Sequence, residues 1–550
     1  MRRLRREDGI AAILTALMLP VFLGIAALAL DVGVWHLTAA RLQKAADAAA
    51  TAGVPYLPDR LDLATTAAKS TSAKNGFTDG VNGVTVTVAP DGSHPSQLKV
   101  TVSTTSSSIF GRALGVSSAK LTRSSVADYT GPLQMGSPCN EYGTDPDPAP
   151  NPNRSAACNG VSGMWGQVYG QAEKKQDGDA FQAATCDATT DGCASGVNVE
   201  YNPTGYYYRV HLSQPLNGKL TIEAFDPMMV DVGAQCTAIR NDNSGMDLRR
   251  AKNPYHPVNL PLSSTDRYAA GVGSGYCTGD YDGGTDYTAP VTTTTFAVSG
   301  PGNVAAGTGG FPSLCTAPFG GVNPSSPDNL FTWLDQGSAA YSTNFAKWFR
   351  QWVPICTLNG SISAGDYLIQ ISTTAAGYLL GQNSFSLRAY SNNSADNVNI
   401  SISGYGAMSA YANTPNGSTD FYLARLSQSA GGKNLTIRLF DLGEGATTGS
   451  YLQVLPPDPT INGTSLSTFS GCTGTGPATV QSSCRVDFAG SFNGKWQTLQ
   501  IPIPNTFTCA ETNSLGCWVR LHLSYAAGSS LHDATSWQAS LDGDPVRLVQ

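Results

Sequence analysis

The hydrophobic pattern separates an apolar N-terminal segment from a long remainder in which apolar and polar residues alternate. Gly9 to Leu30 is an uninterrupted run of 22 residues with Thr15 as its only polar side chain. At about 1.5 Å rise per residue, a helix of this length measures about 33 Å and can cross a hydrocarbon core of roughly 30 Å. The run therefore predicts a transmembrane helix over residues 9–30.

A cluster of basic residues lies on one side of this run only. Arg2, Arg3, Arg5 and Arg6 precede it, and no comparable cluster follows. The positive-inside rule then predicts a single-pass cell-membrane protein with residues 1–8 cytoplasmic and the ectodomain extracytoplasmic. A cleaved secretory signal is the alternative, but its apolar region would be only about 7 to 15 residues long.

The next segment has the pattern of a small α+β head. Trp35 to Ala52 carries a face of small and apolar residues at helical spacing, and Gly53 follows as a stop signal. Apolar and polar residues alternate over Val84–Val88 and Leu98–Val102, which predicts two half-buried strands. A helix laid on a small antiparallel sheet would bury both apolar faces.

These residues resemble the TadE/TadG-like Flp pilus-assembly family, in which an apolar run passes into D-x-G, an aromatic residue and R-L-Q-x-A-A-D-A-A-A. The matching positions are Asp31, Gly33, Trp35, Arg41, Leu42, Gln43, Ala45, Ala46, Asp47, Ala48, Ala49 and Ala50. Weaker similarity continues to about Thr130 through Ile109–Gly111 and SSVADY. The resemblance implies a pilin-like head and a role in pilus or surface-structure assembly. The partners it implies are the lipid bilayer and other pilus-assembly or envelope proteins.

Two departures limit what the resemblance carries over. Leu14 stands at the spacing after Gly9 where prepilin-like members have glutamate, so pilin processing is not carried over. Some relatives also have a D-x-S-x-S metal loop, and the sequence contains no such string.

Beyond residue 130 the sequence predicts a proline-rich linker over residues 131–157 and then a duplicated β unit. Tyr207–Pro227 aligns with Phe421–Leu442 through a shared Ser-Gln, Leu-Thr-Ile and Phe-Asp. The alternating pattern is typical of β-sandwiches, with Tyr208, Val210 and Leu212 on the core face of their strand. The C-terminal strands are expected at residues 496–502, 518–523, 537–541 and 546–549, within the second sandwich or as a third, smaller one.

Composition agrees with an exported, β-rich body. The chain has 13% charged residues, 59 glycines and 32 prolines, and a net charge of −7 without a basic cluster beyond the N-terminus, which argues against nucleic-acid binding. All twelve cysteines lie between Cys139 and Cys517, which favours disulfides formed in an oxidising compartment. Three close pairs fit short loop bridges, although spacing does not determine the connectivity: Cys186/Cys193, Cys472/Cys484 and Cys509/Cys517.

Candidate chemical sites are few. Asp280, Asp282 and Asp286 have oxygen ligands suited to calcium, but they lack the Gly and terminal Glu of an EF-hand loop, and solvated loop carboxylates are the default. The linker residues Asp145 and Asp147 also have such ligands, but the alternating prolines around them disfavour a calcium site. Asp226 and Asp441 follow strands, where aspartate commonly bonds turn backbone.

One segment outside the strands has helical spacing. Thr343–Trp352 places Phe345, Trp348, Phe349 and Trp352 at i, i+3, i+4 and i+7, which indicates an amphipathic helix docked on its own domain. The alternative is an aromatic surface for a protein or glycan.

The expected fold is an N-terminal transmembrane helix with a small α+β head, followed by two or three antiparallel β-sandwich units. The expected segments are 1–8, a cytoplasmic stub; 9–30, the transmembrane helix; 31–130, the head; 131–157, the linker; 158–300, the first sandwich; 301–354, a connection; and 355–550, the second sandwich. No enzyme signature is present, so we expect no catalytic, cofactor or metal residues. The function expected is that of an anchored pilus-assembly protein. The alternatives are a surface adhesin that binds glycan or protein, and an exported hydrolase.

Overall fold

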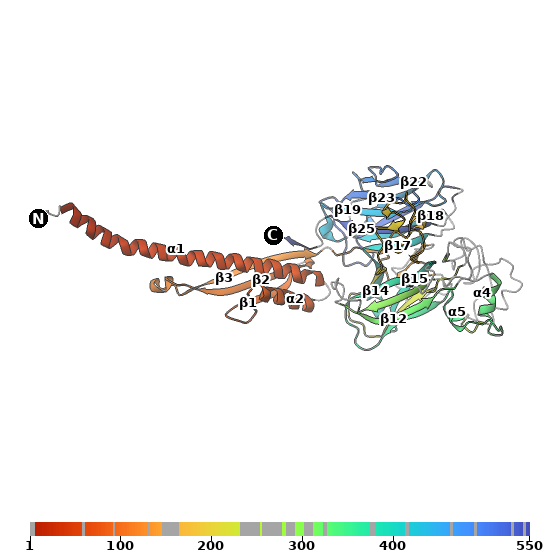
Figure 1. The fold of residues 1–550 in the computed structure, drawn as a ribbon, viewed down its shortest axis with the longest axis horizontal. Helices are drawn as coiled ribbons and strands as arrows, with labels where there is room; N and C mark the ends of the chain where they lie inside the picture. Colours follow the sequence, from red (N-terminus) through yellow and green to blue (C-terminus); the bar gives the residue numbers. More distant parts are fainter. Residues whose placement is uncertain are drawn as a thin grey trace. The chain divides into compact units, whose positions relative to one another are not determined.

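The computed structural model shows a long N-terminal helix followed by mostly antiparallel β-structure, with about 42% of residues in strands, as the sequence predicts (Figure 1). The residues that the structure describes are 6–57, 61–91, 94–129, 131–145, 154, 164–231, 253–255, 278–281, 292–301, 312–322, 327–374, 380–412, 417–462, 466–488, 492–527, 529, 533–542 and 546–549. The chain forms two compact units: residues 1–131 together with 543–550, and residues 132–542.

The first unit begins with α1 (Arg6–Gly53), which joins the apolar run and the predicted amphipathic segment into one continuous helix. It ends where Gly53 and Pro55 interrupt the helical pattern, and η1 (Val54–Tyr56) follows. A second helix, α2 (Leu61–Lys74), packs beside its C-terminal half. The sequence pattern did not indicate α2.

The sheet of the first unit has the order β1-β2-β3-β26 and is antiparallel throughout. Its strands are β1 (Thr85–Asp91), β2 (His94–Ser107), β3 (Ser118–Tyr129) and β26 (Val546–Val549). The short turn η2 (Gly111–Leu114) lies between β2 and β3. Both strands predicted from valine alternation are present as β1 and β2.

Strand β26 corrects one expectation. The sequence pattern predicts residues 546–549 in the second sandwich or in a third one. In the structure Val546 pairs with Tyr129 and Val549 with Val126, so the last strand completes the sheet of the first unit. The pattern of residues 546–549 predicts a strand but not its partner. Any sheet edge with unpaired backbone N–H and C=O groups can form the same hydrogen bonds with that strand.

Within the described residues, the second unit contains a sheet assembly of 20 strands. Its strands are β4 (Gln134–Gly136), β5 (Glu141–Tyr142), β6 (Met164–Tyr169), β9 (Tyr206–Leu212), β10 (Leu220–Phe225), β11 (Thr293–Ser299), β12 (Ser313–Gly320), β13 (Trp352–Leu358), β14 (Gly365–Thr374), β15 (Gln382–Ser391), β16 (Ile400–Tyr405), β17 (Ala407–Ala412), β18 (Ser418–Arg425), β19 (Asn434–Phe440), β20 (Ser450–Leu455), β21 (Thr473–Thr475), β22 (Arg485–Phe488), β23 (Trp496–Pro502), β24 (Trp518–Ser524) and β25 (Asp533–Leu541). The hairpin β7 (Cys193–Ala194) and β8 (Val197–Asn198) stands apart from it. The helices among its described residues are η4 (Lys175–Asp177), α4 (Pro327–Leu334), α5 (Thr343–Trp348), η5 (Ser394–Asn399), η6 (Gln428–Ala430) and α6 (Pro459–Asn462).

These strands form two layers that enclose one core. One layer runs β13-β10-β15-β6-β17-β25-β19-β23-β21, and the other runs β12-β11-β14-β9-β16-β4-β18-β24-β20-β22. Buried residues from both layers belong to the same hydrophobic cluster. Along β9, Tyr208, Val210 and Leu212 are buried and the intervening residues are partly exposed, as their alternation predicts.

The internal repeat has a matching backbone geometry in both copies. Phe225 of β10 pairs with Trp352, and Phe440 of β19 pairs with Trp496. Asp226 and Asp441 then take left-handed backbone conformations, with φ of 53° and 65°. Strands β13 to β15 pair with strands of the first copy, so the first sandwich continues to Ser391, past the expected boundary at residue 355.

The two copies exchange strands. β9 of the first copy is flanked by β14 and β16, and the corresponding strand β18 of the second copy is flanked by β24 and β4. β4 precedes the first copy in sequence and β16 precedes the second, so each copy's leading strand completes the sheet of the other. β6 and β17 join the copies in the opposite layer.

Candidate functional site

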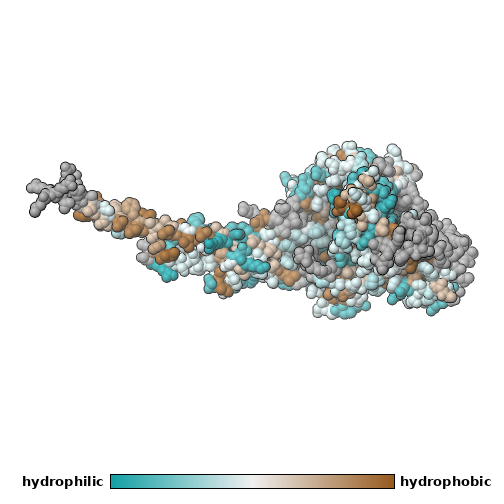
Figure 2. Space-filling view, in the orientation of Figure 1, coloured by the Kyte–Doolittle hydropathy of each residue, from teal (hydrophilic) through white to brown (hydrophobic). Residues whose placement is uncertain are grey.

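The apolar part of α1 has no protein covering it within the described chain. Eleven large apolar side chains between Ile13 and Leu30 are 44% to 66% exposed. Hydrophobic residues accordingly dominate the surface of this part of the helix (Figure 2). The helix is long and apolar enough to cross a membrane by length and composition. Its apolar run ends at Asp31, where the head begins.

Asp31 connects the end of the apolar run to the turn between β2 and β3. Its carboxylate accepts backbone N–H bonds from Ile109 at 2.7 Å, from Phe110 at 3.0 Å and from Gly111 at 2.6 Å. The side chain is buried. Burial raises the pKa of Asp31, but the three backbone donors lower it further, so the carboxylate stays ionised at neutral pH.

Gly111 permits this close approach. A Cβ atom built on Gly111 would lie 2.9 Å from the Val116 carbonyl oxygen and 3.2 Å from Asp31 Oδ2. A larger residue would therefore push the turn away from the helix. The sequence pointed to Asp31 and to Ile109–Gly111 separately, as parts of the resemblance, and the structure brings them together across about 80 positions of sequence.

Other motif residues also hold the head onto α1. Gln43 Nε2 donates to Asp47 Oδ1 at 2.8 Å and to the Ser124 carbonyl oxygen on β3 at 3.2 Å. Arg41 is exposed, and a Cβ atom on Gly33 would have no neighbour within 4 Å. Among the motif residues of α1, Gln43 thus lies on a side bonded to the sheet, whereas Gly33 and Arg41 lie on an open side.

The alanine-rich strip of α1 is used within the chain. Ala45, Ala46, Ala49 and Ala50 are fully buried, and Ala48 is half-buried. Ala46, Ala49 and Ala50 share a hydrophobic cluster with residues of α2 and β2: Ala64, Ala68, Leu98, Val100 and Val102. Small side chains let the helix, the second helix and the sheet approach closely.

Asp226 and Asp441, predicted to bond turn backbone, and the calcium candidate Asp280 all accept backbone N–H groups. Asp226 accepts from the backbone N–H of Arg350, and Asp441 from that of Gly494, as structural turn residues. Asp280 accepts from the backbone N–H groups of Val230 and Ser384, both at 2.9 Å. Burial raises the pKa of Asp226 to about 6, against the lowering effect of the nearby Arg350 guanidinium.

Asp145 accepts an indole N–H bond from Trp352 at 3.2 Å. Asp147, Asp282 and Asp286 lie outside the described residues. Within the described ranges there is no group of three or more His, Cys, Asp or Glu side chains that could hold a metal ion.

The predicted aromatic helix is shorter than expected. α5 ends at Trp348, Phe349 is extended, and Trp352 begins β13. The helix stops because Arg350 adopts a left-handed conformation and donates its N–H to Asp226, a bond between distant segments that the local pattern does not contain. Phe345 and Phe349 are buried in the domain core, in agreement with the docked interpretation.

All three predicted loop disulfides are present: Cys186–Cys193, Cys472–Cys484 and Cys509–Cys517. A fourth, Cys315–Cys356, joins β12 to β13 and was not predicted. Among the described residues there is no free cysteine.

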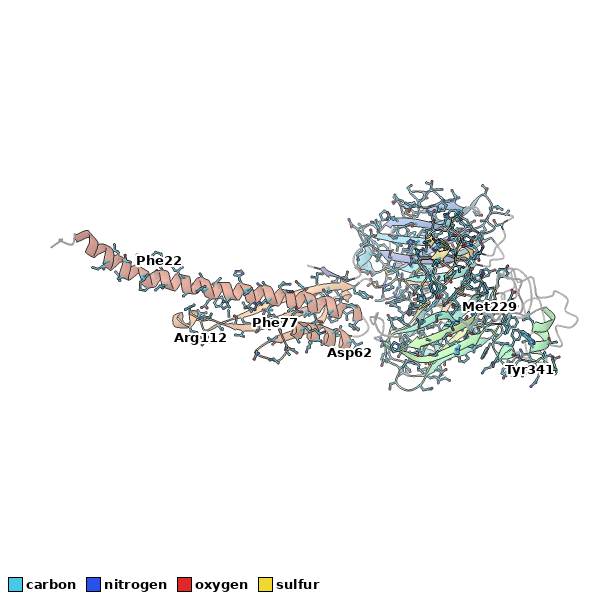
Figure 3. All side chains as sticks on the ribbon, in the orientation of Figure 1. Phe22, Asp62, Phe77, Arg112, Met229 and Tyr341 are labelled. Atoms are coloured by element: carbon cyan, nitrogen blue, oxygen red, sulfur yellow. A yellow bond between two sulfur atoms is a disulfide. The ribbon has the colours of Figure 1, made fainter. Side chains whose placement is uncertain are left out.

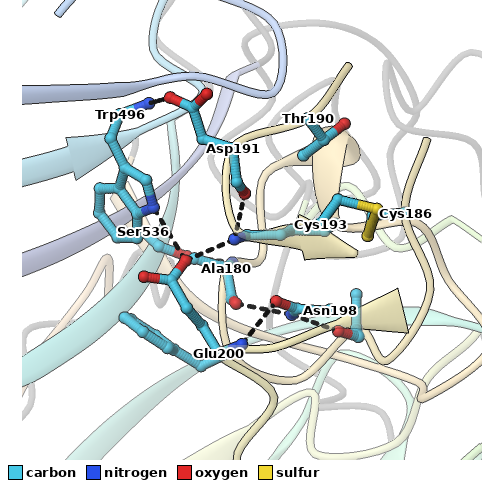
Figure 4. Close-up of polar contacts among 12 residues, drawn as sticks. Ala180, Cys186, Thr190, Asp191, Cys193, Asn198, Glu200, Trp496 and Ser536 are labelled. Carbon is cyan, nitrogen blue, oxygen red and sulfur yellow. Dashed lines mark hydrogen bonds and ion pairs between the residues drawn. A yellow bond between two sulfur atoms is a disulfide. The ribbon is translucent and has the colours of Figure 1, made fainter. Parts of the chain in front are cut away.

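The loop that carries Cys186–Cys193 also forms a buried polar cluster that the sequence did not reveal (Figure 4). Lys175 Nζ, which is fully buried, contacts Glu200 Oε2 at 2.5 Å, and the Trp496 indole N–H donates to the same oxygen at 2.9 Å. Asp191 accepts the Trp496 backbone N–H at 3.0 Å. Burial lowers the pKa of Lys175, opposed by Glu200. The cluster fastens this loop of the first copy to β23 of the second.

Part of the first unit matches a known protein family. Residues 9–66 match the family described as putative Flp pilus-assembly TadE/G-like. The matched segment covers the apolar run, the Asp31 region, the alanine strip and the start of α2. Neither the curated proteins nor the solved structures contain a match to this chain.

Proposed function

We propose that this protein is a single-pass, membrane-anchored component of the bacterial cell envelope that supports assembly of a Flp/Tad-type pilus or related surface structure. The observation that carries the proposal is the TadE/G-like match over residues 9–66. That segment contains both the apolar helix and the residues that attach the head to it. The proposed partners are therefore the lipid bilayer and other pilus-assembly proteins.

The proposed orientation places the N-terminus in the cytoplasm and the head and sandwiches outside. Arginines at positions 2, 3, 5 and 6 support this orientation through the positive-inside rule. The disulfides support it independently, because such bonds persist in oxidising compartments.

The proposed role is associative rather than catalytic. The anchor would fix the position of the protein, the open side of α1 would contact assembly partners, and the disulfide-bonded sandwiches would project as a stable ectodomain. Gly33 and Arg41 lie on that open side, whereas Ala45 and Ala46 are occupied by the head.

A test of partner contact uses a photo-crosslinking amino acid placed by codon suppression in the full chain. Position 41 should yield crosslinks to pilus-assembly proteins in intact cells. Position 45, which is buried in the head, is the matched control and should yield only intramolecular products. Equal intermolecular yields at both positions would contradict the proposed contact surface.

A second test asks whether the anchor is required. The chain is deleted and replaced by wild type or by a variant in which a cleavable signal peptide stands in place of residues 1–30, and surface pili are counted by electron microscopy. We expect pili with wild type only. Normal piliation in the deletion strain, together with lost surface attachment, would instead support the adhesin alternative.

Orientation is tested separately with protease and spheroplasts. A tag placed before Arg2 should stay protected while the ectodomain is degraded. A degraded tag, or a soluble mature product beginning near residue 30, would rule out the proposed topology.

A further inference from the structure

We propose that the turn between β2 and β3, residues 108–117, is a second membrane contact that sits in the lipid headgroup region on the ectodomain side. We call these residues the hairpin tip. The inference rests on the proposed function only in requiring that α1 cross the bilayer. It names a lipid surface as the partner of a part of the head outside the transmembrane run.

Geometry fixes the depth of the hairpin tip. Three backbone N–H groups of the tip bond to Asp31, the residue directly after the apolar run. With a rise of about 1.5 Å per residue, Asp31 is within one helical turn of the last apolar residues of the run. When residues 9–30 fill the hydrocarbon core, the bonded tip lies at the same level as the end of that run.

The side chains of the hairpin tip suit an interface between lipid and water. Ile109 is 64% exposed, Phe110 45% and Val116 44%. Arg112 is also exposed in this turn, and Figure 3 places it beside α1 at the end of the hairpin. Apolar side chains next to a cationic one are typical of segments that lie at the boundary of acyl chains and anionic headgroups.

The start of the head on α1 also exposes apolar side chains. Val32, Val34 and Leu37 are 40%, 38% and 54% exposed, although they follow the charged Asp31. Residues two apart point to different sides of a helix, so these side chains are distributed around α1 and do not form one patch. Apolar exposure on more than one side of the helix, near the level of the hairpin tip, favours lipid over a separate protein partner as the occupant.

Several backbone N–H groups of the hairpin tip form hydrogen bonds within the protein, which suits a partly apolar environment. Irregular backbone at membrane depth is costly unless its polar groups are bonded. The N–H groups of Ile109, Phe110 and Gly111 are taken by Asp31. Within the turn, the Ser108 N–H bonds the Ser117 carbonyl and the Val116 N–H bonds the Gly111 carbonyl. Asp31 thus supplies acceptors that water would supply to an ordinary exposed turn.

The experiment measures the depth of spin labels in the full-length protein. The chain is reconstituted in vesicles of phosphatidylethanolamine and phosphatidylglycerol, with a nitroxide attached to one introduced cysteine. Phe110→Cys reports on the tip and Phe22→Cys on the transmembrane run. Leu61→Cys is the matched control, because Leu61 is an exposed apolar residue (39%) at the other end of the head. The wild-type chain is labelled in parallel to show that native cysteines take no label.

Collisions with oxygen and with a water-soluble nickel chelate are compared by power saturation. We expect the label at position 110 to collide more with oxygen than with nickel, at a depth between that of position 22 and the aqueous value at position 61. A label at 110 that resembles the one at 61, while 22 stays in the bilayer, would overturn this inference and leave the anchor intact. A label at 110 shielded from both reagents would show a protein occupant and overturn it as well. Nickel access at position 22 would overturn the proposed anchoring itself.

A second arm tests the role of Asp31. Asp31→Ala should make the label at 110 more mobile and shift its collision ratio toward nickel. Gln43→Ala removes a bond between α1 and β3 further from the tip and should leave both values unchanged. An unchanged label at 110 in Asp31→Ala would contradict the depth argument.

Discussion

Ala46→Leu offers the most direct test of how α1 and the head fit together. Ala46 is fully buried, in a cluster formed by α1, α2 and β2. A leucine adds three carbon atoms where the structure leaves no exposed surface for the side chain. Overpacking of this kind costs about 1 to 3 kcal/mol of stability. Ala40→Leu is the matched control, because Ala40 is exposed on the same helix and such surface changes stay within about 0.5 kcal/mol.

The assay must isolate the head, because a chain with two compact units does not give one two-state unfolding transition. Hydrogen exchange read by mass spectrometry resolves peptides of β2 and β3 in the full chain. A loss of 1 to 3 kcal/mol in local opening free energy corresponds to about 5- to 150-fold faster exchange. Peptides from the sandwich unit provide the internal reference and should not change.

Three outcomes would refute this reasoning. Unchanged exchange in Ala46→Leu would show that the strip does not pack against the head. Equal acceleration in Ala40→Leu would show that the effect comes from the helix itself and not from the buried face. Reduced crosslinking to partner proteins with an unchanged head would place an intermolecular contact at this strip instead.

Three further predictions concern the rest of the chain. Burial and neighbouring carboxylates raise the pKa of Glu444 to about 7, so the folded state favours the protonated side chain. The melting temperature of the sandwich unit should therefore fall as pH rises from about 5 to 8, and Glu444→Gln should reduce that fall. Replacing Cys186 and Cys193 by serine removes a bridge across 7 positions, which should lower stability by about 2 to 3 kcal/mol and speed proteolysis of that loop; a resistant loop would contradict this. Ending the chain after Asp542 removes β26, so amides of residues 126–129 that face it should exchange faster while sandwich peptides stay protected, and no change would mean that β26 does not close the sheet.

Sequence patterns specified the features that depend on near neighbours. The helix of α1, the alternation of β9 and the short bridge Cys509–Cys517 are each determined by residues within a few positions of one another. Hydrophobic periodicity identifies which face is buried, and a short loop brings its two cysteines together without help from the rest of the fold.

Features that join distant segments were not predicted. Cys315–Cys356 depends on how β12 and β13 meet, and the turn at Ile109 is unrelated to Asp31 until the hairpin folds back along α1. The same reason explains the early end of α5, since the bond from Arg350 to Asp226 outweighs a helical pattern that would otherwise continue. Strand pairing and loop closure of this kind follow from the competition among all possible partners, which a local pattern does not contain.

The exchange of β4 and β16 makes the duplicated sandwich indivisible. A gene fragment that ended at the junction between the copies would encode a first copy without the strand that flanks β9, and its own β4 would have no β18 to join. Each copy therefore contributes a strand to the sheet of the other. Deletion or transfer of one copy would leave unpaired strand edges in both. The unit that can be kept, lost or moved between proteins during evolution is the pair.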